Sequence, residues 1–425
     1  MDTIFALSSG RPPAAVSVIR ISGPGAHEAG RLLGGSLPPP RMAAVRELRH
    51  PHSGDLLDEG LLLRFDGPAS ATGEDVVELH CHGGRAVVNS VLSTLESIEG
   101  LRQAEPGEFT RRSFENGRID LTQAEGLADL LEAETEAQRK AALALAEGGL
   151  SKQIRSWQQR LLGLCARAER AIDYDDEDEL GVDRQLIQES VELETDLRSW
   201  LARPRLETLK DGVRVVVAGP PNAGKSSLVN AIVGTERAIV TDVPGTTRDQ
   251  IEVPLSLSGI PILLVDTAGL RQTADAVEAI GVARAAALVD LSDILLWMGN
   301  PENVPPHKRV IKVHGMADLS GRRTTPAGSI AVSSKTGEGI SALLSTIMSI
   351  LRGLAPAQDA VSLNRRQADL IDAAANRVGA ATGATDAVLF AEELRGARLD
   401  FDQLTGRAGI EDVLDALFGR FCLGK

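Results

Sequence analysis

The chain has 425 residues, of which 43% are hydrophobic and 24% charged, a composition typical of a globular protein with several domains. Its formal charge of −14 opposes nonspecific binding to nucleic acid, so we expect any RNA partner to be held mainly through another protein. The three cysteines form no CxxC pair, which argues against a disulfide framework. The N-terminus lacks the basic segment of a secretory signal, and no apolar run reaches the roughly 18 residues of a membrane span. We therefore expect a cytoplasmic protein without a membrane partner.

Residues 1–118 combine short β-like runs with glycine and proline clusters, a pattern that predicts an α+β domain. The expected strands are residues 15–21, 61–65 and 76–80. The last of them runs into His80-Cys81-His82, which resembles a metal-binding run. Successive side chains of a strand point to opposite faces, so both histidines would share one face and Cys81 would point away. This alternation favours a structural role, or a role in a ligand pocket, over a metal site.

Long helical patterns begin at residue 121. Thr122 and Glu125 fit a capping box, in which each side chain satisfies the other residue's backbone N–H, and they predict a helix start. Gly148-Gly149 predicts a stop before a second helix over residues 150–172. The acidic run 173–179 lacks the ligand and glycine pattern of a calcium loop, which favours a solvated loop.

Helical patterns return after residue 355, so we expect residues 119–210 and 356–425 to pack together as one all-α helical domain. Residues 211–355 begin with the predominantly apolar strand 213–218 (VRVVVA) and then alternate strand and helix signals. This pattern indicates an α/β unit with a parallel sheet. The fold prediction is therefore an α/β domain inserted into an all-α helical domain, with an α+β domain before both.

The segment 219–226 (GPPNAGKS) matches the P-loop pattern GxxxxGK[ST] and lies between an apolar strand and a helix-like run. Its glycines allow backbone N–H groups to surround phosphate oxygens. Lys225 would place a point charge on the β- and γ-phosphates, and the Ser226 hydroxyl would bind Mg²⁺. The sequence thus predicts a nucleoside triphosphate site of the P-loop type.

Two further motifs follow in the order expected of a GTPase. The segment 266–269 (DTAG) ends another apolar strand, which places Asp266 to hold Mg²⁺ through water and the Gly269 N–H to sense the γ-phosphate. Between the motifs lies the loop 241–249 (TDVPGTTRD), whose Thr247 could close over the metal when a γ-phosphate is present. Three motifs in this order predict a switch that hydrolyses GTP.

The motifs that read the base are mixed. Ser333, Ser334 and Lys335 resemble the SAK loop that supports guanine. The usual NKxD motif is replaced by the segment 315–318 (GMAD), in which Asp318 can still accept hydrogen bonds from guanine N1 and N2. Gly315 and Met316 occupy the positions of the asparagine and lysine, so we expect guanine preference to survive but weaken.

The sequence lacks the glutamine that orients the attacking water for hydrolysis in Ras-like switches, because Leu270 occupies that position. The carboxylates of Asp275 and Glu278 follow within the next loop, and either could orient the water. Arg248 is a candidate arginine finger by position only. A monovalent cation could instead neutralise the charge that develops in the transition state.

These motifs resemble those of TrmE-Era-EngA-like G proteins. Together with the segments SVIRISGP near the start, 72–84, 106–130 and 421–425 (FCLGK), they resemble the MnmE (TrmE) family of tRNA-modification GTPases over nearly the whole chain. The resemblance implies a potassium-stimulated GTPase that forms a homodimer through an N-terminal domain, and that domain binds 5-formyl- or methylene-tetrahydrofolate. It also implies a heterotetramer with an FAD-containing MnmG (GidA) partner. The two proteins would add aminomethyl or carboxymethylaminomethyl groups to carbon 5 of the wobble uridine of certain tRNAs.

The resemblance also implies roles for individual residues. Glu278 would be the catalytic residue that orients the water. Folate would contact Arg20, Glu78, Arg118 and Lys425, although the family often has lysine at the position of Arg118. Potassium would be held by Asn222, Thr241, Val243 and Thr246, and Mg²⁺ by Ser226 and Thr247. The residues expected to contact GTP are Asn222, Ala223, Gly224, Lys225, Ser226, Ser227, Thr241, Asp242, Val243, Pro244, Gly245, Thr246, Thr247, Asp266, Thr267, Ala268, Gly269, Asp318, Ser333, Ser334 and Lys335. Cys422 matches the family's terminal cysteine, and the sequence leaves both a structural and a nucleophilic role open for it.

Two other classes of function compete with this interpretation. A ribosome-assembly or RNA-binding GTPase without modification chemistry would need a basic RNA-binding appendage, and none is visible in the sequence. An NTP-driven scaffold without guanine selectivity is suggested by Gly315 and Met316. Similar affinities for ATP and GTP would favour that third class.

Overall fold

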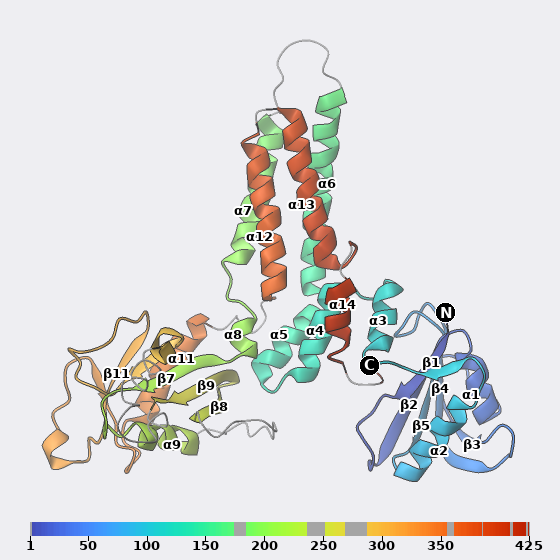
Figure 1. The fold of residues 1–425 in the computed structure, drawn as a ribbon, viewed down its shortest axis with the longest axis horizontal. Helices are drawn as coiled ribbons and strands as arrows, with labels where there is room; N and C mark the ends of the chain where they lie inside the picture. The colour runs from blue at the N-terminus through green and yellow to red at the C-terminus, as the bar shows by residue number, and fades with distance from the viewer. Residues whose placement is uncertain are drawn as a thin grey trace, which may run out of the picture. The chain divides into compact units, whose positions relative to one another are not determined.

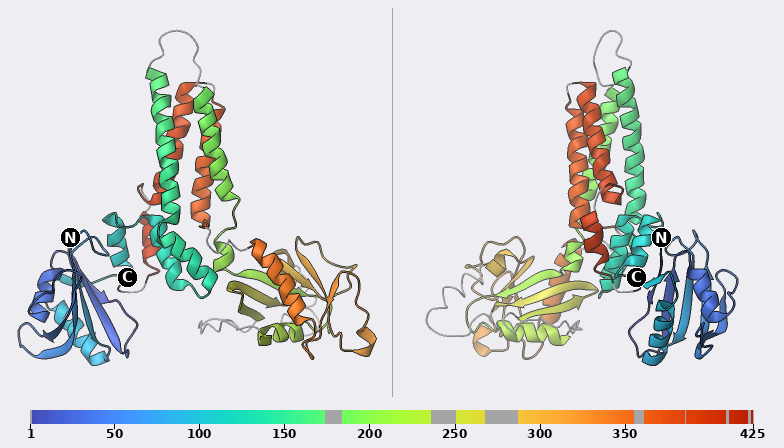
Figure 2. Two further views of the ribbon diagram at one scale, coloured as in Figure 1. Left: turned by 180° about the vertical axis from the view of Figure 1, so that it is seen from behind. Right: turned by 45° about the vertical axis from the view of Figure 1, so that its right-hand side comes forward.

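A computed structural model describes the chain except for residues 1, 174–183, 236–250, 268–286, 355–360, 385, 409–410, 422–423 and 425. The chain divides into two compact units, and each is described by itself (Figures 1 and 2). The first unit contains Met1–Ala128, Ser151–Arg155 and Leu399–Lys425. The second contains Asp129–Leu150 and Ser156–Arg398.

The first unit is built on a six-stranded sheet in the order β3-β4-β5-β2-β1-β6, antiparallel except for the pairing of β1 with β6. The strands are β1 (Thr3–Leu7), β2 (Val16–Ser22), β3 (Ala43–Arg49), β4 (Leu56–Phe65), β5 (Val76–His82) and β6 (Leu101–Gln103). Helices α1 (Ala26–Gly34) and α2 (Arg85–Glu96) contribute Leu33 and Leu95 to a core that also contains Ile19 and Leu79. All three predicted strands and the α+β character are therefore confirmed.

The alternation predicted for residues 80–82 is present in β5. Leu79 and Cys81 are buried in the core beneath α1 and α2, whereas Glu78 and His80 are only partly buried and His82 is exposed. Glu78, His80 and His82 therefore share the face of the sheet that points away from these helices.

The helix that starts near residue 120 has a different capping box from the predicted pair Thr122 and Glu125. Helix α4 (Leu121–Glu132) is capped by Asp120, whose Oδ1 accepts a hydrogen bond from the Gln123 backbone N–H at 3.0 Å. Gln123 Oε1 accepts in turn from the Asp120 N–H at 3.2 Å. Thr122 instead lies inside the helix, fully buried, with its hydroxyl 3.0 Å from that of Ser151.

The same unit also contains α3 (Glu108–Glu115) and α14 (Glu411–Phe418). The Nη1 atom of Arg111 on α3 lies 2.9 Å from Asp415 Oδ1 on α14. Leu121, Phe418 and Phe421 belong to one apolar cluster, so the C-terminal helix packs against the start of α4.

The second unit contains a helical bundle (Figure 1). Its helices are α5 (Glu136–Ala146), α6 (Gly149–Asp173), α7 (Arg184–Leu201), α8 (Glu207–Lys210), α12 (Arg365–Thr382) and α13 (Ala387–Thr405), with parts of α6 and α13 in the first unit. Arg198 on α7 donates to Asn376 on α12 at 3.0 Å, and Trp157 on α6 donates to Asp196 on α7 at 2.9 Å. Helices that precede and follow the α/β unit in sequence therefore pack together, which confirms the predicted insertion.

The α/β unit is a six-stranded sheet in the order β12-β11-β10-β7-β9-β8, parallel except for the pairing of β8 with β9. Its strands are β7 (Val213–Ala218), β8 (Ile251–Leu257), β9 (Ile260–Asp266), β10 (Ile294–Trp297), β11 (Val310–His314) and β12 (Ser329–Ala331). Helices α9 (Lys225–Thr235) and α11 (Ile340–Leu354) pack on it, and Val217, Leu228, Leu264 and Leu343 share one core. The carboxyl ends of the parallel strands meet at one edge, which brings the predicted motifs together.

Among the described residues, no helix combines the length and the apolar character needed to cross a membrane.

Candidate nucleotide-binding site

The loop between β7 and α9 has a backbone that requires glycine at two points. Gly219 and Gly224 have φ angles of 153° and 89°, and a Cβ atom on Gly219 would lie 3.0 Å from the carbonyl carbon of Met298. Asn222, at the tip of the loop, also has a positive φ of 60°. This turn precedes the N-terminus of α9, an arrangement that favours bound phosphate.

Lys225 lies at the start of α9 with 8% of its surface exposed. Its Nζ donates hydrogen bonds to the carbonyl oxygens of Gly219 at 3.0 Å and Pro220 at 2.8 Å. The ammonium group is thus held within the turn by neutral acceptors. Phosphate oxygens can replace these carbonyls as partners, with the added attraction of opposite charge.

The predicted magnesium ligands in the described part of the chain lie side by side. Ser226 Oγ donates to Asp266 Oδ2 at 2.5 Å, and Asp266 is 3% exposed at the end of β9. The next residue, Thr267, donates its hydroxyl to the Val217 carbonyl at 2.9 Å and so joins the ends of β9 and β7. A hydroxyl beside a carboxylate is a set of hard oxygen donors, which fits Mg²⁺.

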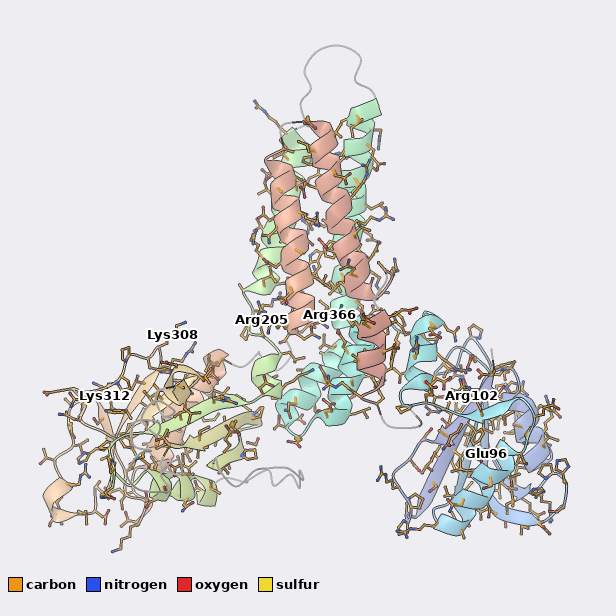
Figure 3. The ribbon with its side chains drawn as sticks, viewed as in Figure 1. Glu96, Arg102, Arg205, Lys308, Lys312 and Arg366 are labelled. Atoms are coloured by element: carbon orange, nitrogen blue, oxygen red, sulfur yellow. The ribbon has the colours of Figure 1, made fainter. Side chains whose placement is uncertain are left out.

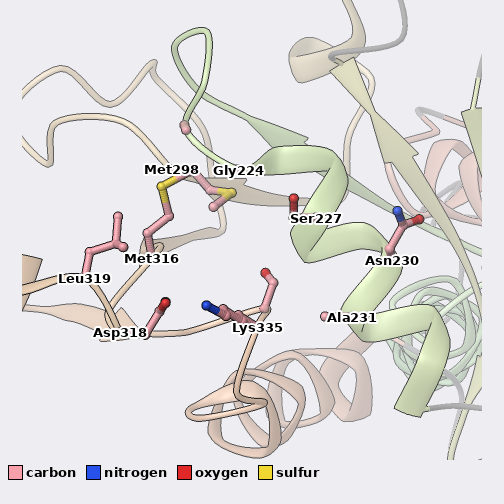
Figure 4. Close-up of a pocket in the computed structure, with 11 residues that line it drawn as sticks. Gly224, Ser227, Asn230, Ala231, Met298, Met316, Asp318, Leu319 and Lys335 are labelled. Atoms are coloured by element: carbon pink, nitrogen blue, oxygen red, sulfur yellow. The ribbon is translucent and has the colours of Figure 1, made fainter.

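A cavity of about 580 Å³ adjoins the phosphate loop (Figure 4). Its lining residues are Ala223, Gly224, Ser227, Asn230, Ala231, Met298, Met316, Asp318, Leu319, Ser334 and Lys335. Its volume lies within the range of small-molecule sites. The P-loop and the predicted base-reading segments therefore border one cavity.

Asp318 is held in place by Ser333. The Ser333 hydroxyl is fully buried, donates to Asp318 Oδ1 at 2.7 Å and accepts from the backbone N–H groups of Lys335 and Thr336 at 3.3 and 3.2 Å. Ser333 therefore acts on a ligand through Asp318, whereas Asp318, Ser334 and Lys335 line the cavity themselves. A fixed carboxylate accepts hydrogen bonds and cannot donate them, as recognition of the N1–H and N2–H groups of guanine requires.

Five residues that line the cavity were not among the predicted contacts: Asn230, Ala231, Met298, Met316 and Leu319. Asn230 and Ala231 lie three and four positions after Ser227 on α9, so helical spacing alone would have placed them on its face. Met298 follows β10, which pairs with β7, and only the strand order reveals that it borders the P-loop.

Several predicted residues lie outside the described part of the chain. They are the catalytic Glu278, the GTP contacts Thr241, Asp242, Val243, Pro244, Gly245, Thr246, Thr247, Ala268 and Gly269, and the folate contact Lys425. The same holds for Arg248, Leu270, Asp275, Cys422 and most of the acidic run 173–179.

Two of the predicted folate residues are paired in the first unit. Arg20 on β2 stands opposite Glu78 on β5, and its Nε donates to Glu78 Oε1 at 2.9 Å. The Arg20 guanidinium lies 5.7 Å from the ring centre of Phe109, and His80 Nε2 lies 3.4 Å from Glu78 Oε2. This face of the sheet thus combines an aromatic ring with groups that both donate and accept hydrogen bonds.

The other described folate candidate, Arg118, follows α3. A Cβ atom on Gly73, in the loop before β5, would lie 3.2 Å from Arg118 Cγ, so the stem of Arg118 packs against this loop. At the C-terminus, a Cβ atom on Gly424 would lie 2.2 Å from the Leu7 carbonyl oxygen. Leu7 pairs with Ile19, the neighbour of Arg20, so Gly424 lies close to the strand that carries Arg20.

A cluster of His27, Asp66 and Asp75 in the first unit has the donor atoms of a metal site, but Arg64 already neutralises one of its carboxylates. His27, Asp66 and Asp75 bring one ligand atom each within 4.8 Å of one another. Arg64 pairs with both oxygens of Asp66, at 2.7 and 3.0 Å. The hydrogen bond from Arg64 is the main cause that lowers the pKa of Asp66. We interpret the group as a structural ion-pair cluster.

Comparison with known proteins gives full-length matches. A family model described as MnmE helical domain matches residues 121–422, and one described as GTP-binding protein TrmE N-terminus matches residues 3–118. A tRNA modification GTPase MnmE from Erythrobacter litoralis is 50% identical over 427 residues, covering 100% of both chains. One from Rhizorhabdus wittichii is 51% identical over 430 residues, covering 100% of this chain and 97% of the relative. Among solved structures, the G domain of the T. maritima FeoB iron transporter matches with 28% identity and a TM-score of 0.24, covering 33% of this chain and 98% of that one.

Proposed function

The chain belongs to the MnmE family of tRNA modification GTPases, and on this premise we propose that potassium stimulates its GTP hydrolysis and that it works with an MnmG (GidA) flavoprotein. The proposed product is a tRNA with an aminomethyl or carboxymethylaminomethyl group at carbon 5 of the wobble uridine. The observation that carries the GTPase chemistry is the contact of Ser226 with Asp266, next to Lys225, in a P-loop that borders a cavity lined by Asp318.

The described residues bind and orient the nucleotide. Asp318 accepts hydrogen bonds from guanine, the P-loop N–H groups surround the phosphates, and Lys225 stabilises negative charge on the β- and γ-phosphates. Ser226, Asp266 and Thr247 would hold Mg²⁺, which neutralises charge on the phosphate oxygens when it is bound. Glu278 would orient the attacking water, since Leu270 has no group that could do so.

Replacing Glu278 by alanine tests the water-orienting role. We expect nucleotide affinity to stay within about twofold of wild type while kcat falls by about 10²-fold or more, because loss of an acid–base group costs about that much. Single-turnover hydrolysis and equilibrium nucleotide binding measure the two effects separately, with Asp275→Ala as the matched control. An unchanged kcat in Glu278→Ala would show that another group orients the water.

The cation role is supported by the family resemblance and by the place of Asn222 at the tip of the phosphate turn. Asn222 and the carbonyl oxygens of Thr241, Val243 and Thr246 would hold potassium next to the phosphates, where it would take the place of an arginine finger. We expect faster hydrolysis in KCl than in NaCl at equal ionic strength. Equal rates in both salts would remove the potassium role and leave the GTPase assignment intact.

For the N-terminal unit we propose folate binding and homodimerisation. The pair Arg20–Glu78 offers donors and an acceptor for a pterin ring, and the positive charge of Arg118 and Lys425 suits a glutamate tail. The folate would supply the one-carbon unit, as 5-formyl- or methylene-tetrahydrofolate. The decisive experiment is mass spectrometry of wobble uridines in tRNA from a deletion strain, complemented by wild type or by Arg20→Ala. Normal modification in the deletion strain would refute the tRNA role.

One observation favours direct contact with RNA as a second candidate function, that of an RNA-binding GTPase without modification chemistry. Arg203, Arg205 and Arg365 line a cavity of about 520 Å³ in the second unit, and Figure 3 labels Arg205 and Arg366 in the same region. Positive charge of this kind suits a phosphate backbone. The two functions differ in the effect of Arg205→Glu on tRNA affinity without the flavoprotein. A large loss favours direct binding, and no change favours our proposal that the partner holds the tRNA.

A further inference from the structure

We propose that this chain reads guanine from one edge only, because Met298 and Met316 form an apolar clamp where NKxD proteins place the asparagine and lysine. Asp318 would select the N1–H and N2–H edge, while the N7 edge would meet no side-chain donor from positions 315 and 316. The proposal rests on the function proposed above and deepens it, since it states which guanine nucleotides the cavity accepts.

The first step concerns the space at position 315. A Cβ atom on Gly315 would lie 2.7 Å from the Met298 terminal methyl and 3.2 Å from the Ala223 carbonyl oxygen. Met298 is 4% exposed and packs in the core of the α/β unit, so it already fills this volume. A side chain at 315 and the Met298 methyl therefore compete for one place, which explains glycine in a motif that otherwise carries asparagine.

The second step concerns Met316, which has a φ of 59°. A residue with a long side chain pays a free-energy cost to adopt this left-handed conformation, whereas glycine adopts it without that cost. Its terminal methyl lies 3.2 Å from a Cβ atom placed on Gly224, and the Met298 methyl lies 3.9 Å from the same point. Both thioethers thus converge on the P-loop, as Figure 4 shows.

Arg322 contacts one side of the clamp, because its guanidinium lies 4.0 Å from Met316 Sδ. Methionine is polarisable and makes favourable contacts with aromatic rings, so the pair can pack on a purine through dispersion. A thioether is a weak acceptor and cannot donate a hydrogen bond to N7. Guanine held at Asp318 by N1–H and N2–H turns its N7 away from that carboxylate, toward groups other than Asp318.

The consequence is a characteristic order of affinities for nucleoside diphosphates in the presence of Mg²⁺. We expect 7-deaza-GDP to bind within about threefold of GDP, since no side chain at positions 315 and 316 can donate a hydrogen bond to N7. IDP, which lacks the 2-amino group, should bind about 10- to 100-fold more weakly, because a hydrogen bond to a charged group is lost. Isothermal titration of the full chain measures all three, and a 7-deaza-GDP affinity tenfold below that of GDP would overturn the proposal.

Two variants distinguish the effect of the clamp on GDP affinity from its effect on folding. Met316→Gly removes the thioether and the left-handed strain together, so we expect an unfolding midpoint no lower than wild type and a GDP affinity about tenfold weaker. Equal GDP affinity in this variant would overturn the clamp. Leu291→Ala, at an exposed residue of the second unit that does not line the cavity, is the matched control and should change GDP affinity less than threefold.

A double substitution tests the competition at position 315. Gly315→Asn should weaken GDP binding by itself, because its side chain must displace Met298. Adding Met298→Ala should restore affinity and create a preference for GDP over 7-deaza-GDP, since the carboxamide now has room to donate to N7. Independent effects of the two substitutions would refute the competition. Absence of any nucleotide binding by wild type would instead refute the proposed GTPase function, so the two failures are distinguishable.

Discussion

At the scale of single residues, both described cysteines, Cys81 and Cys165, are buried, and burial lowers their reactivity. Cys81 is 2% exposed, and its burial, together with the negative charge of Asp58, raises the pKa of its thiol from 9.0 to about 12. Burial is also the main cause that raises the pKa of Cys165. The thiolate is the nucleophile of cysteine, so both residues are inert at neutral pH. A structural role for Cys81, which the alternation of residues 80–82 predicts, agrees with this environment.

We predict that Cys81 is alkylated by iodoacetamide about 10³-fold more slowly in the native protein at pH 8 than after unfolding. The factor follows from the fall in thiolate fraction when the pKa rises from 9.0 to about 12. Mass spectrometry of the peptide that contains residues 76–82 measures the rate at this residue alone. Equal rates before and after unfolding would contradict the buried position.

The same shift predicts a pH dependence of stability. A thiol with a raised pKa stays protonated in the native state, while the unfolded chain begins to release its proton near pH 9. The free energy of unfolding should therefore fall as the pH rises from about 9 toward about 12. Cys81→Ala should reduce this slope in urea titrations, and a slope identical to that of wild type would argue against the shift.

At the scale of helices and strands, the start of α4 shows what a local pattern can and cannot decide. Asp120 with Gln123 and Thr122 with Glu125 both match a capping box, and the sequence does not rank them. Thr122 is excluded as the cap by a tertiary contact, because its hydroxyl is buried against that of Ser151. The helix therefore begins two residues earlier than the predicted box implies.

We predict that Asp120→Ala lowers the free energy of unfolding by about 1 kcal/mol, the usual cost of losing an N-cap acceptor. Asp120→Asn keeps a side-chain oxygen, so it should lower the free energy of unfolding by only a few tenths of that amount. Urea unfolding followed by circular dichroism measures both variants. Equal losses for alanine and asparagine would show that the charge of Asp120, and not its acceptor, stabilises this end of the helix.

Strands were easier to predict than the cavity. Residues 213–218 are apolar apart from the half-buried Arg214 because both faces of β7 are covered, and residues 76–82 alternate because only one face of β5 lies in the core. Met298 belongs to no motif, and only the pairing of β10 with β7 brings it to the P-loop. The P-loop and Asp318 could thus be found from sequence, whereas the apolar wall of the cavity depends on tertiary structure.

At the scale of the whole molecule, the insertion joins segments that are distant in sequence. Helices α7 and α12 are separated by the entire α/β unit, yet Arg198 on the first contacts Asn376 on the second. Helical periodicity on both sides of the insertion predicts such packing, because an amphipathic helix has to bury its apolar face. The contacts that pair α7 with α12 in particular cannot be deduced from periodicity alone.

The last prediction concerns which part of the chain a nucleotide stabilises. A ligand that binds only the folded state stabilises it by about 2.7 kcal/mol at 100 times its Kd. The cavity and the P-loop lie in the second unit, so Mg²⁺ with GDP should slow hydrogen exchange in residues 213–235. Residues 16–22 and 76–82 of the first unit should be unaffected, and 5-formyltetrahydrofolate should produce the opposite pattern.

Hydrogen exchange of the full chain with mass spectrometry measures this contrast, with Lys225→Ala as the control. Lys225 supplies the charge at the phosphate turn, so the variant should lose the protection caused by GDP and keep that caused by folate. Protection of both units by GDP would mean that they open in one cooperative step, since a ligand slows exchange only through openings that destroy its site. Confined protection would mean that each unit opens by itself, and that any signal from GTP to the proposed folate face must be carried by a conformational change rather than by shared stability.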